Sequence, residues 1–176
     1  RTADDLGRFG LGLKTASFSQ CRRLTVASIC DGRMNCLRWD LDVLASSPDD
    51  GWHLLEGPGA GSEYLLGPLI AAGRGTLVLW ERLDRIVTPG STEQDLLDLI
   101  DGVERHLAMV FHRHLDGGRP GLLLSLNGRL VAPWDPFLRE HPATWSSPVE
   151  RIRSAGGLME VQCHVLPHKD HLTGQQ

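Results

Sequence analysis

A glycine-rich segment near the beginning of the sequence combines residue types that bind phosphate groups. Gly7, Gly10 and Gly12 are followed by Lys14 and Thr15, just ahead of a segment with helical character. Glycine lets backbone N–H groups approach an anion closely, and the first turn of a helix adds N–H donors that have no acceptor within the helix. A lysine beside these donors supplies a full positive charge. The combination predicts binding of a polyphosphate, and nucleotide binding is therefore the first hypothesis.

The spacing of these glycines excludes two common phosphate-binding motifs. A Walker A loop requires G-x-x-x-x-G-K-[ST], but Leu13 separates Gly12 from Lys14. The dinucleotide-binding motif G-x-G-x-x-G follows a strand, and here the glycine spacing is reversed, as G-x-x-G-x-G. A third type of phosphate-binding segment is needed to explain the pattern.

Residues 6–18, with the sequence LGRFGLGLKTASF, resemble the glycine-rich lid motif of the GHKL ATPases. This superfamily includes DNA gyrase B, the heat-shock-ninety chaperones, histidine kinases, MutL and the MORC proteins, and the chaperone and MORC version of the motif is the most similar. The resemblance implies that backbone amides of the motif wrap the phosphates of ATP. The positions that match are Gly7, Arg8, Phe9, Gly10, Leu11, Gly12 and Leu13. Lys14 matches a lysine of the MORC type, and both a phosphate contact and a solvent-facing role stay open for it.

A second segment is similar to the strand that closes the same nucleotide pocket. Residues 73–80 read GRGTLVLW, and the family pattern at this place is G-T-x-[IV]. The resemblance implies that Thr76 belongs to the nucleotide site. A Gly-Thr pair before a β-branched strand is common in other proteins, so this segment adds modest support.

The sequence also departs from the family pattern. GHKL enzymes carry, upstream of the lid, a Glu that activates water, an Asn that holds Mg²⁺ and an Asp-x-Gly-x-Gly turn that reads adenine. None of these is present, and Asp4-Asp5-Leu6-Gly7 lacks the second glycine of that turn. We therefore expect that the chain begins inside the ATP-binding domain, that the ligand for Mg²⁺ lies before Arg1, and that no catalytic residue is in this chain.

Composition and charge restrict the classes of partner. The 176 residues carry a formal net charge of −4 with a pI near 6.0, so no overall positive field favours nucleic acid, and a nucleic-acid partner stays open only for the parent protein. Arg22 and Arg23 are expected to be a solvated pair of charges and not a nucleic-acid patch. No stretch approaches about 20 uninterrupted apolar residues, and no signal-peptide pattern is seen, so we expect a cytoplasmic protein with no membrane partner. The cysteines form no C-x-x-C pair, and we expect neither disulfides nor a metal site. They are Cys21, Cys30, Cys36 and Cys163.

The first half of the sequence reads as a helix followed by strands. A short helix is predicted for residues 15–21, and strands for residues 24–29 and 34–41. Asp31-Gly32 between these two strands predicts a type I′ hairpin turn. Residues 46–67 lack a sustained period and read as irregular, and residues 75–80 predict a further strand.

The second half begins with a long amphipathic helix. Apolar residues at helical spacing predict a helix from Ser91 to about Leu115, with Ser91 and Gln94 in a capping-box pattern. Asn127-Gly128 predicts a second hairpin between residues 122–126 and 129–132, and residues 158–166 predict another strand.

These elements predict an α+β protein of two parts. Residues 1–88 resemble the C-terminal part of a GHKL ATP-binding domain, which implies a partial Bergerat fold, a two-layer sandwich of a mixed β-sheet and helices. Residues 89–176 resemble the start of a transducer domain. In the family, a transducer lysine reaches the terminal phosphate, and Lys169 is the only lysine besides Lys14. A solvated lysine on a polar tail is the alternative.

Two hypotheses about function follow. In the first, the parent protein is a Mg²⁺-dependent ATPase in which closure of the lid, with possible homodimerisation, drives a conformational change. In the second, the chain is a non-catalytic module, a degenerate nucleotide fold or a protein-interaction domain, and its glycines only shape a turn. An upstream Glu-x-x-x-Asn helix and Asp-x-Gly-x-Gly turn in the parent reading frame would favour the first hypothesis.

Overall fold

The structure, a computed structural model, describes residues 11–48, 51–117 and 121–173. The chain divides into two compact units, Arg1–Thr92 and Glu93–Gln176, and each is considered by itself. Both contain helices and strands, so the α+β class predicted from the sequence is confirmed. In the described ranges, no helix has the length and apolar character needed to cross a bilayer.

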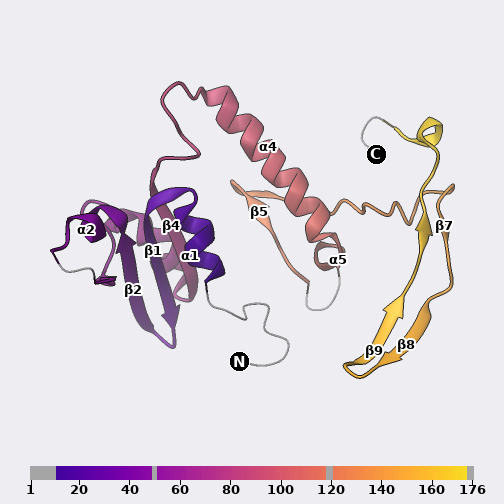
Figure 1. The fold of residues 1–176 in the computed structure, drawn as a ribbon, viewed down its shortest axis with the longest axis horizontal. Coiled ribbons are helices and arrows are strands. Elements are labelled where there is room, and N and C mark those ends of the chain that lie inside the picture. Colours follow the sequence, from indigo (N-terminus) through magenta and orange to yellow (C-terminus); the bar gives the residue numbers. More distant parts are fainter. Residues whose placement is uncertain (1–10, 49–50, 118–120, 174–176) are drawn as a thin grey trace. The chain divides into compact units, whose positions relative to one another are not determined.

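The first unit is built on a four-stranded sheet. Its strands are β1 (Cys21–Cys30), β2 (Arg33–Asp40), β3 (Leu55–Glu56) and β4 (Gly75–Leu83), in the spatial order β3-β2-β1-β4 (Figure 1). Every neighbouring pair in this sheet is antiparallel, which corrects the expectation of a mixed sheet. The tight β1–β2 turn allows only an antiparallel pair, because a parallel neighbour needs a long crossover connection.

The turn between β1 and β2 has the conformation predicted from the Asp-Gly pair. Asp31 and Gly32 have φ angles of 49° and 72°, both in the left-handed region that a type I′ turn requires. β1 and β2 then pair from Cys30↔Arg33 to Arg23↔Asp40. This local signal fixes the register of β1 against β2.

Replacement of Gly32 by alanine is expected to destabilise the first unit. A side chain in the left-handed region costs about 1 kcal/mol. The free energy of unfolding of the Gly32→Ala variant, measured by urea titration, should therefore be lower than that of the unsubstituted chain by about this amount. Gly67→Ala is the control, because Gly67 has a φ of −48° and open space around a Cβ atom. Equal stability of the Gly32→Ala variant and the parent chain would contradict this prediction.

Short helices lie against both faces of this sheet. Because side chains alternate along a strand, Ala27 of β1 faces the side opposite to Leu24. On the Ala27 side, Leu66 and Leu69 are buried and form the core, contributed by η1 (Glu63–Leu66) and α3 (Gly67–Ala72). α1 (Gly12–Phe18) contacts the Leu24 side, and α2 (Leu41–Ser46) follows β2 directly. The predicted irregular region therefore contains β3, η1 and the start of α3.

In the described residues of the second unit, two consecutive helices are followed by three small antiparallel pairs of strands. The helices are α4 (Glu93–Val110) and α5 (His112–Leu115). The strand pairs are β5 (Ser125–Leu126) with β6 (Arg129–Leu130), β7 (Trp145–Ser146) with β10 (His164–Val165), and β8 (Glu150–Ser154) with β9 (Gly157–Val161). The unit also contains η2 (Lys169–His171). The β5–β6 turn is the predicted one, because Asn127 and Gly128 have φ angles of 51° and 81°.

The long helix differs from its prediction at both ends. α4 begins at Glu93, so Thr92 and not Ser91 occupies the capping position. The Ser91 hydroxyl instead accepts a hydrogen bond from the backbone N–H of Thr88 at 3.0 Å. At the other end Phe111 leaves the helical conformation, with φ −99° and ψ 7°, and separates α4 from α5.

Candidate functional site

The glycine segment is only partly within the described residues. Gly7, Arg8, Phe9 and Gly10 lie outside them, whereas Leu11, Gly12, Leu13 and Lys14 form the start of α1. Leu11 occupies the capping position without a side-chain hydrogen bond to the helix, and the first turn contains no acidic residue. The first N–H groups of a helix have no intrahelical acceptor. Among the described residues, no capping or acidic side chain of the first turn competes with an anion for these N–H groups.

The glycine at the start of α1 leaves its backbone accessible. A Cβ atom built at Gly12 meets no other atom within 4 Å, and the neighbouring side chains of Leu11 and Leu13 are exposed. The fold itself therefore does not require glycine at this position. A ligand that approaches the backbone closely would explain it.

Lys14 lies over an aromatic ring. Its Nζ atom is 5.0 Å from the centroid of the Trp39 ring, a cation–π distance. One turn further along α1, the fully buried Ser17 accepts a hydrogen bond from Nε1 of Trp80 at 2.9 Å. Two tryptophans of the sheet thus contact one face of α1, and the phosphate role of Lys14 stays a prediction.

The other two predicted residues are Thr76 and Lys169. Thr76 lies exposed on β4, with its hydroxyl 3.1 Å from that of Ser28. It shares a sheet face with Trp80, but four residues of strand separate the two, or about 13 Å. Lys169 is exposed in η2 of the second unit. Their roles in a nucleotide site stay predictions.

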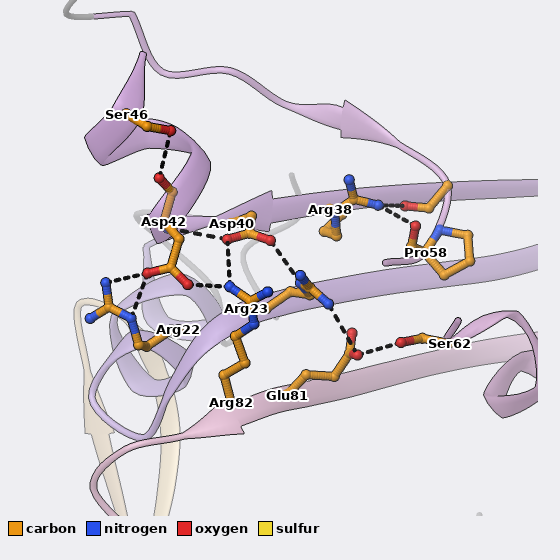
Figure 2. A network of polar contacts seen from close by, with 11 residues as sticks. Arg22, Arg23, Arg38, Asp40, Asp42, Ser46, Pro58, Ser62, Glu81 and Arg82 are labelled. Atoms are coloured by element: carbon orange, nitrogen blue, oxygen red, sulfur yellow. Dashed lines mark hydrogen bonds and ion pairs between the residues drawn. The ribbon is translucent and has the colours of Figure 1, made fainter. Parts of the chain in front are cut away.

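A buried cluster of charges lies on the sheet face opposite to α1. Arg23 of β1 pairs in register with Asp40 of β2 and with Glu81 of β4. Its Nε donates to Asp40 at 2.7 Å, and its Nη1 lies 3.5 Å from Glu81, so one cation lies between two carboxylates (Figure 2). The side chains are 14%, 3% and 15% exposed. We call Arg23, Asp40 and Glu81 the charge cluster.

The charge cluster is covered by the segment that follows β3. Ser62 donates a hydrogen bond to Glu81, and Arg38 donates to the carbonyl oxygens of Gly57 and Pro58 (Figure 2). A Cβ atom at Gly59 would lie 2.3 Å from Nη1 of Arg23, so a larger residue there would require the Arg23 guanidinium to shift. The cluster therefore fixes the covering segment on the sheet and has a structural role.

The charge cluster was not predicted from the sequence. Arg22 and Arg23 read as a pair of solvated charges, but only Arg22 is half exposed, in contact with Asp42 and Asp84. Arg23 lies on the same face of β1 as Cys21 and the buried Thr25, two residues away on either side. This spacing is the signal that places Arg23 on a covered face. The prediction of a solvated pair is wrong for Arg23.

The charge cluster keeps Asp40 ionised. Burial acts to raise the pKa of Asp40, but the hydrogen bond and the charge of Arg23 outweigh it and hold that pKa below its ordinary value. The other oxygen of Asp40 accepts from the backbone N–H of Asp42 at 3.1 Å and caps α2. The carboxylate therefore supports both the sheet and a helix.

Acid is expected to weaken the first unit through Asp40. In the unfolded chain an aspartate binds a proton near pH 3.9, whereas folded Asp40 does so only at a lower pH. Its contribution to stability is complete above that unfolded pKa and is lost as the pH falls below about 4. The free energy of unfolding, from urea titrations at pH 5 and pH 3, should decrease more in the parent chain than in Asp40→Asn. Equal decreases would contradict this prediction.

The second unit contains a separate groove. It has a volume of about 700 Å³, and its lining includes His112, Trp134, Asp135 and Arg139. Nδ1 of the buried His112 donates to the Met109 carbonyl at 2.7 Å, and its Nε2 lies 3.6 Å from Asp135. Arg139 donates to the other oxygen of Asp135 at 2.6 Å. Among the described residues, no three His, Cys, Asp or Glu side chains gather to hold a metal ion.

Comparison with known proteins gives one match. A family model described as histidine kinase-, DNA gyrase B-, and HSP90-like ATPase matches residues 1–57. The matched region contains the glycine segment, α1, β1, β2, α2 and β3. No curated protein and no solved structure matches the chain. The match supports the GHKL resemblance for the first part of the first unit.

Proposed function

We propose that this chain supplies the phosphate-binding glycine segment of a GHKL-type ATP-binding domain. The observation that carries the proposal is the match of an ATPase family model to residues 1–57, which contain that segment. The start of α1 supports it, because Leu11 makes no side-chain cap and no acidic residue lies in the first turn. A negatively charged ligand suits these conditions.

In this proposal the backbone holds the phosphates of ATP. The amides that donate are those of Gly7, Arg8, Phe9, Gly10, Leu11, Gly12 and Leu13. Lys14 adds a positive charge to one phosphate, and Thr76 belongs to the strand that closes the pocket. These groups bind and orient the phosphates, and the sequence places no general base beside them.

Magnesium is the expected companion of ATP in this superfamily. The ion would neutralise charge on the phosphates when bound. The described residues contain no cluster of three acidic, histidine or cysteine side chains that suits a metal ion, so its ligand is assigned to none of them. No hydrolytic step is assigned to this chain.

The wider assignment extends to the parent protein. We propose that residues 1–88 belong to the ATP-binding domain and residues 89–176 to a transducer-like domain, and that Lys169 contacts the terminal phosphate. ATP binding would then drive a conformational change, with a homodimer as the expected assembly. The MORC and chaperone branches of the superfamily fit the glycine motif best.

Calorimetric titration of the chain with ATP and Mg²⁺ tests the proposal. We expect saturable binding, and its loss in a Gly10→Val/Gly12→Val variant whose circular dichroism matches that of the parent chain. Saturable binding that is unchanged in this variant would remove the lid assignment. No binding by the parent protein in the same titration would favour the non-catalytic module.

A further inference from the structure

α1 packs on a row of three side chains of the sheet. Leu24 of β1 pairs in register with Trp39 of β2 on one side and with Trp80 of β4 on the other. The three side chains therefore lie side by side on the same face. Leu24 is fully buried, and both tryptophans are partly exposed.

The two tryptophans contact α1 in different ways. Trp80 donates its indole N–H to Ser17, whereas Trp39 presents its ring to the ammonium group of Lys14. Lys14 and Ser17 are three residues apart and thus lie on one face of the helix. The Ser17 contact fixes the position of α1, and the Trp39 contact fixes the end of the Lys14 side chain.

The Trp39 contact selects one arrangement of a flexible side chain. Lysine has a four-carbon stem and three N–H donors on a compact charge. Among the described residues, the Trp39 ring contacts the Lys14 ammonium group, and no carboxylate forms an ion pair with Lys14. A ring face occupies one side of an ammonium group, which leaves its other N–H donors available for oxygen acceptors.

We propose that Trp39 is a positioning residue that holds the Lys14 ammonium ready to meet a phosphate of ATP. This inference rests on the proposed function, since it requires that Lys14 contacts a phosphate. Trp39 does not itself touch the ligand in this arrangement. Its ring restricts the Lys14 side chain before the phosphate binds, so that less conformational entropy is lost on binding.

A double-mutant cycle on ATP affinity tests the proposal. We expect Lys14→Met to weaken ATP binding about tenfold, because a charged hydrogen bond to phosphate is lost. Trp39→Leu should weaken it about threefold, the effect of a lost cation–π contact, and Trp39→Phe should restore most of this affinity. On the Lys14→Met background, Trp39→Leu should have no further effect. A threefold loss on both backgrounds would show that Trp39 acts only through packing, and would overturn the proposal.

Trp80→Leu is the matched control, because it removes the other tryptophan contact of α1. Any effect of Trp80→Leu on affinity should be the same with and without Lys14. Coupling of Trp80 to Lys14 as strong as that of Trp39 would also overturn the proposal, since both residues would then act by docking the helix.

A measurement on the free chain separates this inference from the proposed function. The Lys14 methylene protons beside the ammonium group should show an upfield NMR ring-current shift that disappears in Trp39→Leu. If the shift is present but the parent chain binds no ATP, the proposed function fails and the phosphate role of the contact fails with it. If ATP binds but the shift is absent, the proposed function stands and the positioning role of Trp39 is overturned.

Discussion

The Gly12→Ala variant is expected to lose ATP affinity while it keeps its fold. In the structure a Cβ atom at Gly12 has open space, and the residue begins α1 with helical backbone. Alanine is favoured over glycine in helices, so the free energy of unfolding should be unchanged or should rise by up to about 1 kcal/mol. In the proposed function the phosphates of ATP approach this backbone, and a methyl group would obstruct them. We expect a loss of about tenfold in affinity, equivalent to about 1.4 kcal/mol.

A matched substitution in the second unit controls for the effect of alanine on helices. Gly102 lies within α4 and also has open space around a Cβ atom. Gly102→Ala should therefore raise stability similarly and leave the calorimetric titration with ATP unchanged. The prediction for Gly12 fails if Gly12→Ala and Gly102→Ala bind ATP equally well.

Local signals in the sequence predicted the hairpins well. Both turns with an Asp-Gly or Asn-Gly pair have the left-handed φ angles that such pairs favour. The strands predicted at residues 24–29 and 75–80 occur as the centre of β1 and the first part of β4. These turns and strands are determined by residues that are close together in the sequence, so they can be predicted from one sequence.

Two other local features were missed or misplaced, because residue type alone did not define them. β8 has the sequence ERIRS, in which apolar and polar residues do not alternate. It forms a strand through its pairing with β9. The start of α4 was misplaced because Ser91 has the right residue type for a cap, yet its hydroxyl bonds to Thr88. The residue type alone did not distinguish these two hydrogen bonds.

The candidate site was predictable only where its residues are adjacent in the sequence. The glycine segment and Lys14 are contiguous, and the family match covers them. The contact of Lys14 with Trp39 requires knowledge of which strand lies under α1. The charge cluster requires more, because Arg23 meets partners 17 and 58 residues away, through the order and register of three strands.

Removal of Asp40 is expected to be the most destabilising single substitution in the charge cluster. Asp40→Ala leaves the Arg23 guanidinium, 14% exposed, with only the more distant Glu81 as a carboxylate partner. Loss of one member of a buried ion pair typically costs 3–5 kcal/mol, because the remaining charge stays desolvated. The α2 cap is lost as well. We expect the free energy of unfolding of the first unit to fall by about 3 kcal/mol.

The comparison with Asp42 isolates the contribution of burial. Asp42 also pairs with two arginines, Arg22 and Arg82, but its side chain is 40% exposed. Water and salt screen such a pair, so Asp42→Ala should cost much less than Asp40→Ala. Urea titration, with hydrogen exchange of the β1 amides to assign the change to the first unit, measures both. Similar losses in the two variants would mean that the covering segment does not desolvate Arg23, and that the charge cluster behaves as a surface network.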